Sequence, residues 1–193
     1  FLLNGGMVTL DPLLISSTSN VNSNVAIIEA FYPGMEGSNA LAQSIFGQAN
    51  KWGKMPYTVY KQGWAERHSI LDHDVTHNRT YRYASAADTA VAFGAGLSLT
   101  GFTLKFAGTG AGVGSQHPVS DWPTASGTAS ANTTFSVVVT NTGALKGDEV
   151  VMAYFLPVDV PLSLHPRKAL LDFQRLDDIS PGASATASFT IGP

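Results

Sequence analysis

The first half of the chain carries a strand pattern, a helix pattern and a second strand pattern in direct succession. An apolar run over residues 25–32, Val-Ala-Ile-Ile-Glu-Ala-Phe-Tyr, ends at Pro33-Gly34. A run too short for a helix and rich in β-branched and aromatic residues predicts a strand buried on both faces. A helix pattern over 38–47 follows, and then a short strand pattern over 55–60. Strand, helix and strand in this order predict an α/β layer.

The predicted helix has start and stop signals of its own. Ser38 or Asn39 can cap its first turn, and Gly47 stands where the glycine after a helix belongs. Between them, apolar residues recur on one face, at Leu41, Ala42, Ile45 and Phe46.

The middle of the chain is less regular. Residues 61–79 are polar without a period, Tyr81-Arg82-Tyr83 predicts a short extended segment, and residues 93–98 form a tight glycine loop in which Gly94 and Gly96 can take positive φ. Residues 107–131 are dense in Gly, Ala, Ser and Thr, and we interpret them as a linker.

Beyond the linker the pattern becomes all-β. Phe135, Val137 and Val139 alternate with polar residues, and Asn141-Thr142-Gly143 marks a turn. Further strands are predicted over 150–156, 169–176 and 187–191, the last after a turn at Pro181-Gly182. Short strands with regular turn signals predict a β-sandwich, of which about four strands are present here.

Composition excludes several classes of function. With 193 residues, 44% of them hydrophobic, the chain can bury a core. The net charge of −3 has no basic stripe, so nucleic-acid binding is not expected. No apolar run reaches the roughly 18 residues of a membrane span. The absence of cysteine leaves the cellular compartment open. The first residues, Phe1-Leu2-Leu3, look like the middle of a strand, so we expect the chain to be a piece of a longer polypeptide.

Three blocks of sequence resemble one known family. Residues 30–56 contain Tyr-Pro-Gly-Met-Glu-Gly and, further on, Ala-Leu-Ala-Gln-Ser-Ile-Phe-Gly; residues 79–102 contain Arg-Thr-Tyr-Arg-Tyr and Phe-Gly-Ala-Gly-Leu-Ser; and residues 137–151 contain Val-Thr-Asn-Thr-Gly and Gly-Asp-Glu-Val-Val. A later match consists of Lys168, Leu170, Phe173, Arg175, Leu176, Pro181 and Gly182. In order and spacing these blocks are similar to the C-terminal portion of family 3 glycoside hydrolases, of the β-xylosidase/β-glucosidase kind.

The resemblance implies an architecture and a division of labour. Residues 1–104 would be the end of an α/β sandwich domain, 105–131 a linker and first strand region, and 132–193 an incomplete all-β, immunoglobulin-like (fibronectin type III-like) sandwich. The chain as a whole, an α/β layer fragment followed by this sandwich, would be truncated at both ends. The enzyme would be a retaining exo-acting β-glycosidase that needs no cofactor or metal. Its nucleophile lies on an N-terminal TIM-like barrel and its acid/base Glu earlier in the α/β domain. This chain alone is therefore predicted to contain no catalytic residue and to be inactive.

Two carboxylates of the chain are the candidates for a local substitute. Glu29 lies inside the apolar strand, where an unpaired carboxyl would have a raised pKa and mark a functional site. Pairing with the backbone or an Arg is the alternative and the commoner case. Glu36, at the start of the predicted helix, is explained by the helix dipole.

The polar loop holds Asp72-His73-Asp74 and His77. In a helix, His73 and His77 would share a face, as zinc ligands do. No helical period surrounds them and no third ligand is visible, so we favour an exposed loop at the rim of the sugar site over a metal centre.

Aromatic residues supply further candidates for the sugar-site rim. Trp52, Trp64 and Trp122 could stack on sugar rings, although core packing explains any one of them as well. Of these we place Trp52 and Trp64 at the rim, together with His73 and His77. The sequons at Asn78 and Asn132 are candidate N-glycosylation sites.

Two functional hypotheses follow. In the first, the chain is the structural C-terminal part of a secreted or vacuolar glycosidase that hydrolyses terminal glycosyl residues, and its partners are the rest of the same polypeptide and a carbohydrate substrate. In the second, it is a non-catalytic structural or carbohydrate-binding subunit of a larger assembly, because its low charged fraction, 13%, suits a surface covered by partners.

Overall fold

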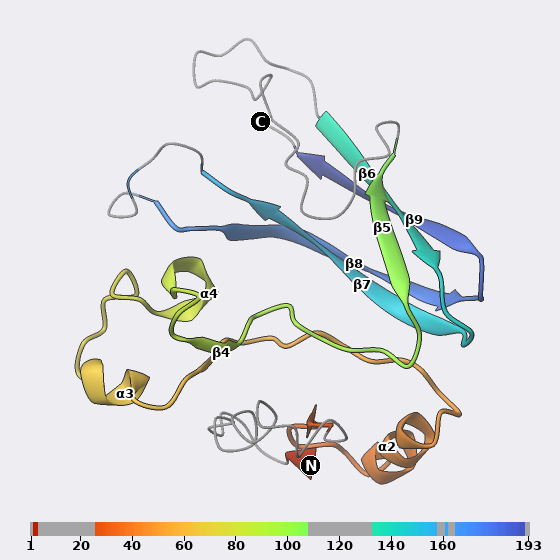
Figure 1. Ribbon diagram of the computed structural model, residues 1–193, viewed down its shortest axis with the longest axis horizontal. Coiled ribbons are helices and arrows are strands. Elements are labelled where there is room, and N and C mark those ends of the chain that lie inside the picture. Colours follow the sequence, from red (N-terminus) through yellow and green to blue (C-terminus); the bar gives the residue numbers. More distant parts are fainter. Residues whose placement is uncertain (1, 4–25, 108–132, 158–160, 162–164, 192–193) are drawn as a thin grey trace. The chain divides into compact units, whose positions relative to one another are not determined.

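The computed structural model describes residues 2–3, 26–107, 133–157, 161 and 165–191 (Figure 1). These residues form mostly β-strands in small sheets, with few helices. The chain divides into two compact units that each draw on separate stretches of sequence. Unit 1 comprises residues 1–43, 54–96 and 155–169, and unit 2 comprises residues 44–53, 97–154 and 170–193. Among the described helices, none combines the length and the apolar composition that a membrane crossing requires.

The strand predicted over residues 25–32 is much shorter than expected. Strand β2, Ile28–Glu29, pairs in parallel with β1, Leu2–Leu3. The prediction of burial on both faces was wrong, because Ile28 and Glu29 are only half-buried and Tyr32 is exposed. Phe31 ends the strand at a φ of 52°, held there because the Glu29 carboxylate accepts a hydrogen bond from its backbone N–H at 3.0 Å. The parallel pairing itself agrees with the predicted α/β layer.

Helix α2, Gly37–Ile45, occupies the predicted place but begins earlier than expected. The backbone N–H of Gly37 donates to the carbonyl of Gly34, which starts the first turn before Ser38 and Asn39. Both residues therefore lie inside the helix, and their predicted capping role was wrong. The stop signal is confirmed, because Gly47 has a φ of 73°, a conformation that glycine adopts without steric cost.

The rest of unit 1 is built around a small antiparallel sheet. Strand β3, Val59–Tyr60, falls within the strand predicted over 55–60 and pairs with β4, Thr89–Val91. Two single-turn helices lie between them, α3, Trp64–Arg67, and α4, Thr80–Tyr83. The extended segment predicted at 81–83 is thus helical. The turn closes because the N–H of Ala84 donates to the carbonyl of Thr80, and the Tyr81 ring stacks on Phe93 at 4.2 Å.

Unit 2 contains two sheets (Figure 1). Strand β6, Thr133–Asn141, lies between β5, Phe102–Phe106, and β9, Ser184–Ile191, and pairs with both in antiparallel fashion. The second sheet pairs β7, Gly147–Phe155, with β8, Ala169–Ile179. The strands predicted from alternation are all present. The predicted domain boundary between residues 104 and 105 falls inside β5, which pairs with β6.

Side chains from both sheets form one hydrophobic core. Its buried members are Val139 of β6, Val151 of β7, Ile179 of β8, and Ala187 and Phe189 of β9. Half-buried apolar residues surround them: Phe102, Leu104, Val137, Ala153, Leu176 and Ala185. Two sheets that share a core in this way form a sandwich, as the alternating pattern predicts.

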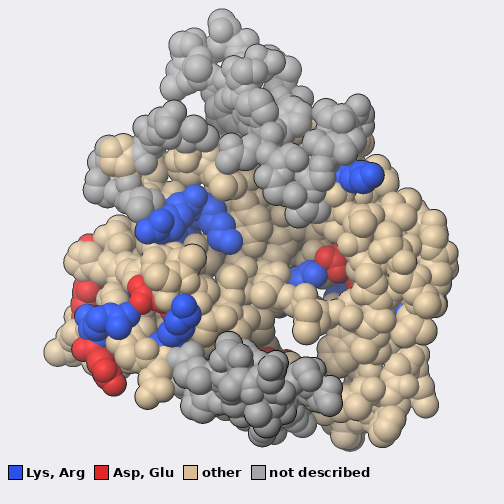
Figure 2. Space-filling model, viewed as in Figure 1, with Lys and Arg blue, Asp and Glu red and all other residues tan. Residues whose placement is uncertain are grey.

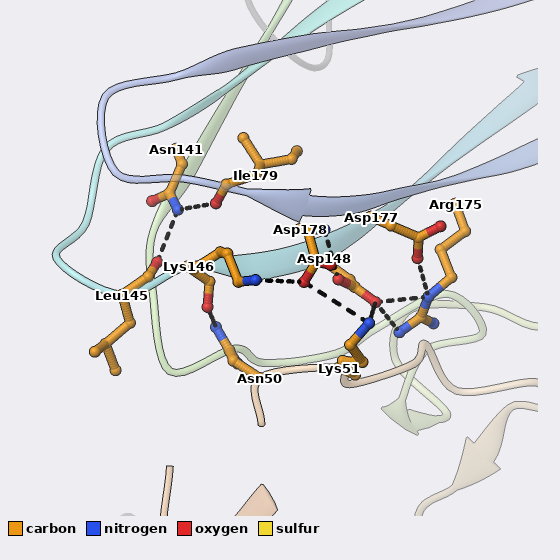
Figure 3. Close-up of polar contacts among 10 residues, drawn as sticks. All are labelled: Asn50, Lys51, Asn141, Leu145, Lys146, Asp148, Arg175, Asp177, Asp178 and Ile179. Carbon is orange, nitrogen blue, oxygen red and sulfur yellow. Dashed lines mark hydrogen bonds and ion pairs between the residues drawn. The ribbon is translucent and has the colours of Figure 1, made fainter. Parts of the chain in front are cut away.

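Buried hydrogen bonds fix the turn predicted at Asn141-Thr142-Gly143. The side chain of Asn141 is fully buried. Its Oδ1 accepts hydrogen bonds from the Thr100 hydroxyl at 2.9 Å and from the Gly143 N–H at 3.0 Å. Its Nδ2 donates to the carbonyls of Leu145 and Ile179, both at 2.8 Å (Figure 3). Every hydrogen-bonding position of this amide is therefore satisfied.

Candidate functional site

The rings of Tyr60, Trp64 and His68 form a stack at the base of the polar loop. Tyr60 ends β3, Trp64 opens α3, and His68 follows that helix. The Trp64 ring lies 3.9 Å from Tyr60 and 4.4 Å from His68 between centroids, and both pairs are nearly parallel. His68 is fixed through its Nδ1, which lies 2.8 Å from the Trp64 carbonyl oxygen. The predicted rim residue Trp64 therefore has a packing role within unit 1.

Arg79, the last residue of the polar loop, contacts both the Trp64 ring and Asp72. Its guanidinium carbon lies 5.4 Å from the centroid of the Trp64 ring, within range of a cation–π interaction. Its Nη2 donates to the Ser69 carbonyl at 2.7 Å and lies 3.9 Å from the Asp72 carboxylate. The Nε of Arg79 and the Nε1 of Trp64 are both buried and have no hydrogen-bond partner among the described residues.

Two strained residues hold Arg79 in place. Asn78 and Thr80 on either side of it both have a φ of 58°, an unfavourable conformation for a β-branched residue such as Thr80. The hydroxyl of Tyr60 accepts a hydrogen bond from the Thr80 N–H at 2.6 Å. The Asn78 side chain accepts from the Ser85 N–H at 2.7 Å and donates to Asp88 at 2.6 Å. Strain of this kind persists where surrounding contacts over-determine the backbone.

Asp72, Asp74 and His77 form a cluster of ion pairs within the polar loop. Nδ1 of His77 lies 2.8 Å from the Asp72 carboxylate, and its Nε2 lies 3.7 Å from that of Asp74. The hydrogen bond to Asp72 and the two negative charges raise the pKa of His77. Hydrogen bonds from His77 lower the pKa of Asp72, and those from Thr76 lower the pKa of Asp74. Backbone turns rather than a helix connect these residues, as predicted, and His73 is exposed.

The metal alternative finds no support in this loop. Within residues 26–107 and the other described stretches, no group of three or more His, Cys, Asp or Glu side chains is placed to hold a metal ion. The four rim candidates divide between the units: Trp64, His73 and His77 belong to unit 1, and the half-buried Trp52 belongs to unit 2. Arg79 and Asp72 link Trp64 to His77. Among the residues that the structure describes, no hydrogen bond or ion pair joins His73 to this group. Trp122 and Asn132 lie outside the described residues.

The sequon at Asn78 has its acceptor nitrogen in use. Nδ2 of Asn78, the atom to which a glycan would be attached, donates to Asp88. The Asp88 carboxylate also accepts from the Ser85 hydroxyl at 2.8 Å and pairs with Arg67. Hydrogen bonds from Ser85 and Asn78 and the charge of Arg67 lower the pKa of Asp88. Glycosylation at Asn78 stays a prediction, and it would require this cluster to open.

The second polar cluster, in unit 2, surrounds Asn50 and Asp148 (Figure 3). Oδ1 of Asn50 accepts from the Ser98 hydroxyl and the Leu99 N–H at 3.0 and 3.1 Å, and its Nδ2 donates to the Lys146 carbonyl at 3.3 Å. The Asn50 carbonyl accepts from the N–H of Asp148 at 3.0 Å. This one residue therefore fastens the segment 44–53 to the start of β7.

The carboxylate of Asp148 is almost completely buried. It accepts hydrogen bonds from Nε and Nη2 of Arg175 and from the N–H of Asp178, and Nζ of Lys51 lies 4.0 Å away (Figure 3). Burial alone would raise the pKa of Asp148, but the hydrogen bonds from Asp178 and Arg175 and the positive charges outweigh it and lower the pKa. A carboxylate held ionised in this way holds its hydrogen-bond donors in place and is a poor proton donor.

Of the two remaining candidate carboxylates, Glu29 is explained by local contacts. The Glu29 side chain accepts hydrogen bonds from the Phe31 N–H and from the Tyr57 hydroxyl, both at 3.0 Å, which is the paired alternative that the sequence left open. Glu36 is exposed and precedes α2, as predicted.

Figure 2 shows that the charged side chains on the visible face are few, and that most of that face carries none.

Sequence reasoning missed the residues that organise both clusters. Tyr60 and His68 could have been found by their spacing of four residues from Trp64. Nothing in the sequence pairs Asn50 with Lys146 or Asp148 with Arg175, because the partners are far apart along the chain.

Comparisons with known proteins agree on one family. The sequence model described as glycosyl hydrolase family 3 C-terminal domain matches residues 1–100. A xylan 1,4-beta-xylosidase of Xylanibacter ruminicola is 34% identical over 167 residues, which are 86% of this chain and 17% of that protein. The beta-glucosidase cel3A of Pyricularia oryzae is 31% identical over 95% of this chain and 26% of its own length. The crystal structure of the beta-glucosidase D2-BGL from Chaetomella raphigera superposes with a TM-score of 0.73 at 27% identity, over 99% of this chain and 27% of that one.

Proposed function

The chain belongs to glycoside hydrolase family 3, and from this membership we propose that it is the C-terminal, structural part of a retaining exo-acting β-glycosidase. The whole enzyme would remove terminal xylosyl or glucosyl residues. The observation that carries the proposal is the family match over residues 1–100, together with relatives whose names are β-xylosidase and β-glucosidase. The chain spans only 17% and 26% of the lengths of these two relatives, and we therefore assign the activity to a longer polypeptide.

The electrostatics of the described carboxyls support a non-catalytic role for this part. Retaining glycosidases use two carboxyl groups about 5–5.5 Å apart, one of which must have a raised pKa in order to donate a proton. Asp72, Asp74, Asp88 and Asp148 all have a lowered pKa, because hydrogen bonds and positive charges stabilise their ionised forms. Such groups are poor general acids, so none of these four suits the role of proton donor. We assign the catalytic pair to residues outside this chain because the family resemblance places both groups earlier in the polypeptide.

The role of the chain would then be to complete the α/β layer and to supply the sandwich. The parallel pair β1–β2 followed by α2 supports the first part, and the two-sheet core of unit 2 supports the second. We assign the sandwich to the fibronectin type III-like class on the sequence blocks at 137–151 and 168–182. Secretion or vacuolar targeting is part of the same proposal and rests only on the resemblance to the enzyme family.

The direct test compares the longer polypeptide that contains residues 1–193 with this chain alone. We expect the longer protein to hydrolyse aryl β-xylosides or aryl β-glucosides and to release the β-anomer first, as NMR of the product would record. The chain alone should give no turnover above the uncatalysed rate. Activity of the chain alone would show that it carries its own catalytic pair.

The second candidate, a non-catalytic subunit of a larger assembly, is favoured by one observation. Several large apolar side chains of the described residues are exposed by 80% or more: Tyr32, Met35, Phe46, Ile70, Leu71 and Leu97. Surface of this kind is usually covered by a partner. The intact mass of the native protein separates the two candidates, because a mass close to 20.3 kDa would leave no room for a barrel.

A further inference from the structure

Two neighbouring arginines of unit 1 have no carboxylate partner. The structure describes all five arginines of the chain, and three of them pair with an aspartate: Arg67, Arg79 and Arg175. Arg82 and Arg167 form no ion pair with any described residue. Carboxylates are not scarce, because the chain has 14 acidic and 11 basic residues. The absence of a partner is therefore particular to these two positions.

The fold brings the two arginines together from distant parts of the sequence. Arg82 lies in α4 and Arg167 in the segment before β8, and both belong to unit 1. The backbone N–H of Arg167 donates to the Arg82 carbonyl at 2.7 Å. Its side-chain Nε donates to the carbonyl of Tyr83, the last residue of α4, at 3.1 Å. The Arg167 guanidinium is therefore held at the C-terminal end of this helix.

Capping of α4 explains only part of this arrangement. A guanidinium has five N–H donors, and of the ten on Arg82 and Arg167 the Nε–H of Arg167 alone has a partner among the described residues. The dipole of a single-turn helix is small, so the cap does not account for the second positive charge at Arg82. Both side chains are exposed. Most donors of this pair are thus available to a ligand.

The surface around the pair is positively charged. Figure 2 shows Lys and Arg side chains gathered in the region between α4 and the start of β8, and no Asp or Glu side chain lies among them on the visible face. Elsewhere in unit 1, by contrast, Arg67 and Arg79 lie beside acidic partners. This patch is therefore suited to an anion.

The geometry of arginine indicates which anion fits. Two N–H groups of a guanidinium lie in one plane and match the two oxygens of a carboxylate. The substrates proposed above are carbohydrates, and the sugars that carry a carboxylate are the uronic acids. Exposed guanidiniums keep contact with water when they bind, so the desolvation cost is small and binding is weak and reversible. A uronic acid residue of a polysaccharide meets these requirements.

We propose that Arg82 and Arg167 form a binding site for the carboxylate of an acidic sugar residue. The inference rests on the proposed function, because the choice of a sugar as the carrier of the carboxylate comes from it. The site would retain polysaccharides that contain uronic acid residues, in addition to the neutral glycosides that the whole enzyme would hydrolyse.

Calorimetric titration of the longer polypeptide that contains residues 1–193 with methyl β-glucuronoside tests the site. Arg82→Gln removes one charge and no side-chain hydrogen bond of the described residues, and it should weaken binding by about tenfold or more. Lys105→Gln is the matched control, since Lys105 is an exposed cation of β5 without an ion pair among the described residues. It should bind as the parent does. Equal affinities of the two variants, or no binding by the parent, would overturn the proposal.

Two further ligands separate a carboxylate site from other sources of affinity. Binding of the neutral methyl β-glucoside should not differ between the parent and Arg82→Gln, because this ligand has no carboxylate. Inorganic phosphate supplies the same charge without a sugar. A patch that binds phosphate through Arg82 and does not bind the glucuronoside would overturn the assignment to an acidic sugar.

A conservative variant tests the planar fork itself. Arg82→Lys keeps the charge but cannot present two parallel N–H groups, so it should bind the glucuronoside severalfold more weakly than the parent. Affinity equal to that of the parent would mean that charge alone attracts the ligand, which contradicts the proposed geometry. Hydrolysis of a neutral aryl glycoside by the parent is measured on the same preparation. An active enzyme that does not bind the glucuronoside removes this inference alone, and a binding but inactive protein removes the proposed function alone.

Discussion

The carboxylate of Asp148 on β7, 1% exposed, accepts hydrogen bonds from Nε and Nη2 of Arg175 on β8 at 3.0 and 2.8 Å. The pair crosses between the two strands of the second sheet, and the same carboxylate also accepts the N–H of Asp178. Because the acceptor is buried while the guanidinium is partly in water, the pair stabilises chiefly by satisfying groups that would otherwise lose their partners.

Replacing Asp148 should therefore destabilise unit 2. We expect Asp148→Ala to lower the free energy of unfolding by about 2–4 kcal/mol, since it removes both the buried acceptor of Arg175 and the acceptor of the Asp178 N–H. Urea or thermal unfolding of the protein that carries this chain measures the change. Asp177→Ala is the matched control, because the Asp177 carboxylate is 66% exposed and makes one ion pair with Arg175 at 3.3 Å. A loss of similar size in both variants would show that burial of Asp148 does not matter.

Asn141 should tolerate no substitution that changes its hydrogen bonds. Asn141→Ala leaves two carbonyls, one hydroxyl and one N–H without their partner, and we expect a loss of about 3 kcal/mol or more in the free energy of unfolding. Asn141→Asp keeps the shape but replaces the NH₂ group by an oxygen that faces the carbonyls of Leu145 and Ile179, so it should be at least as harmful. Asn39→Ala, on the exposed surface of α2, serves as the control and should stay within about 0.5 kcal/mol of the parent.

Gly143 is required for a steric reason. A Cβ atom at this position would lie 2.2 Å from the Thr100 hydroxyl and 2.7 Å from the backbone nitrogen of Gly101. A rotamer change cannot move a backbone atom, so Gly143→Ala should cost about 2 kcal/mol of folding free energy. Gly53→Ala provides the comparison, because a Cβ there meets nothing within 4 Å. Equal midpoints of thermal unfolding for the two variants would mean that the turn at 141–143 can shift.

The order of loop 69–79 should depend on pH through His77 and the two carboxylates. Because the pKa of His77 is raised in the folded loop, protonated His77 stabilises the loop. This stabilisation is complete below the ordinary histidine pKa of about 6.5 and is lost as the pH rises through the raised pKa. Because the pKa values of Asp72 and Asp74 are lowered in the folded loop, their ionised forms stabilise it. This stabilisation is present above about pH 4 and is lost as the pH falls through the lowered pKa values. We therefore expect the loop to be most ordered between about pH 4 and 6.5.

NMR titration of the histidine ring signals checks this directly. His77 should titrate above its ordinary range in the parent and return toward about 6.5 in Asp72→Asn, where the ion pair is lost. An unchanged His77 titration in that variant would contradict the interaction with Asp72.

Trp52 and Trp64 should respond differently to truncation. Trp64→Ala removes the centre of the stack with Tyr60 and His68, and we expect a loss of about 2 kcal/mol in the free energy of unfolding. Trp52 is half-buried, and its predicted place is the rim of the sugar site. Trp52→Ala in the longer enzyme should therefore raise KM for the glycoside with a smaller effect on stability. A destabilised Trp52→Ala enzyme with an unchanged KM would place Trp52 in the core instead.

What the sequence determined by itself is largely local. The alternation over Phe135, Val137 and Val139 predicted β6, since a period of two puts one face of a strand into a core. Gly47 and Gly182 marked the end of α2 and the turn before β9, because both take a positive φ that other residues adopt only at a cost. The family blocks are local signals too, because each consists of residues that are close together in the sequence.

Where local signals failed, a contact from elsewhere in the chain decided. The apolar run at 25–32 became a strand of two residues because Glu29, Phe31 and the distant Tyr57 bend the chain there. Residues 81–83 are helical, and two distant residues contact this turn. The Tyr60 hydroxyl accepts a hydrogen bond from the Thr80 N–H, and the Phe93 ring stacks on Tyr81.

The polar clusters depended on tertiary structure throughout. Asn50 with Lys146 and Asp148 with Arg175 are pairs that no local pattern relates, and only the folded chain brings them within hydrogen-bonding distance. Burial then makes each polar group depend on its partner, because water is no longer present to replace it.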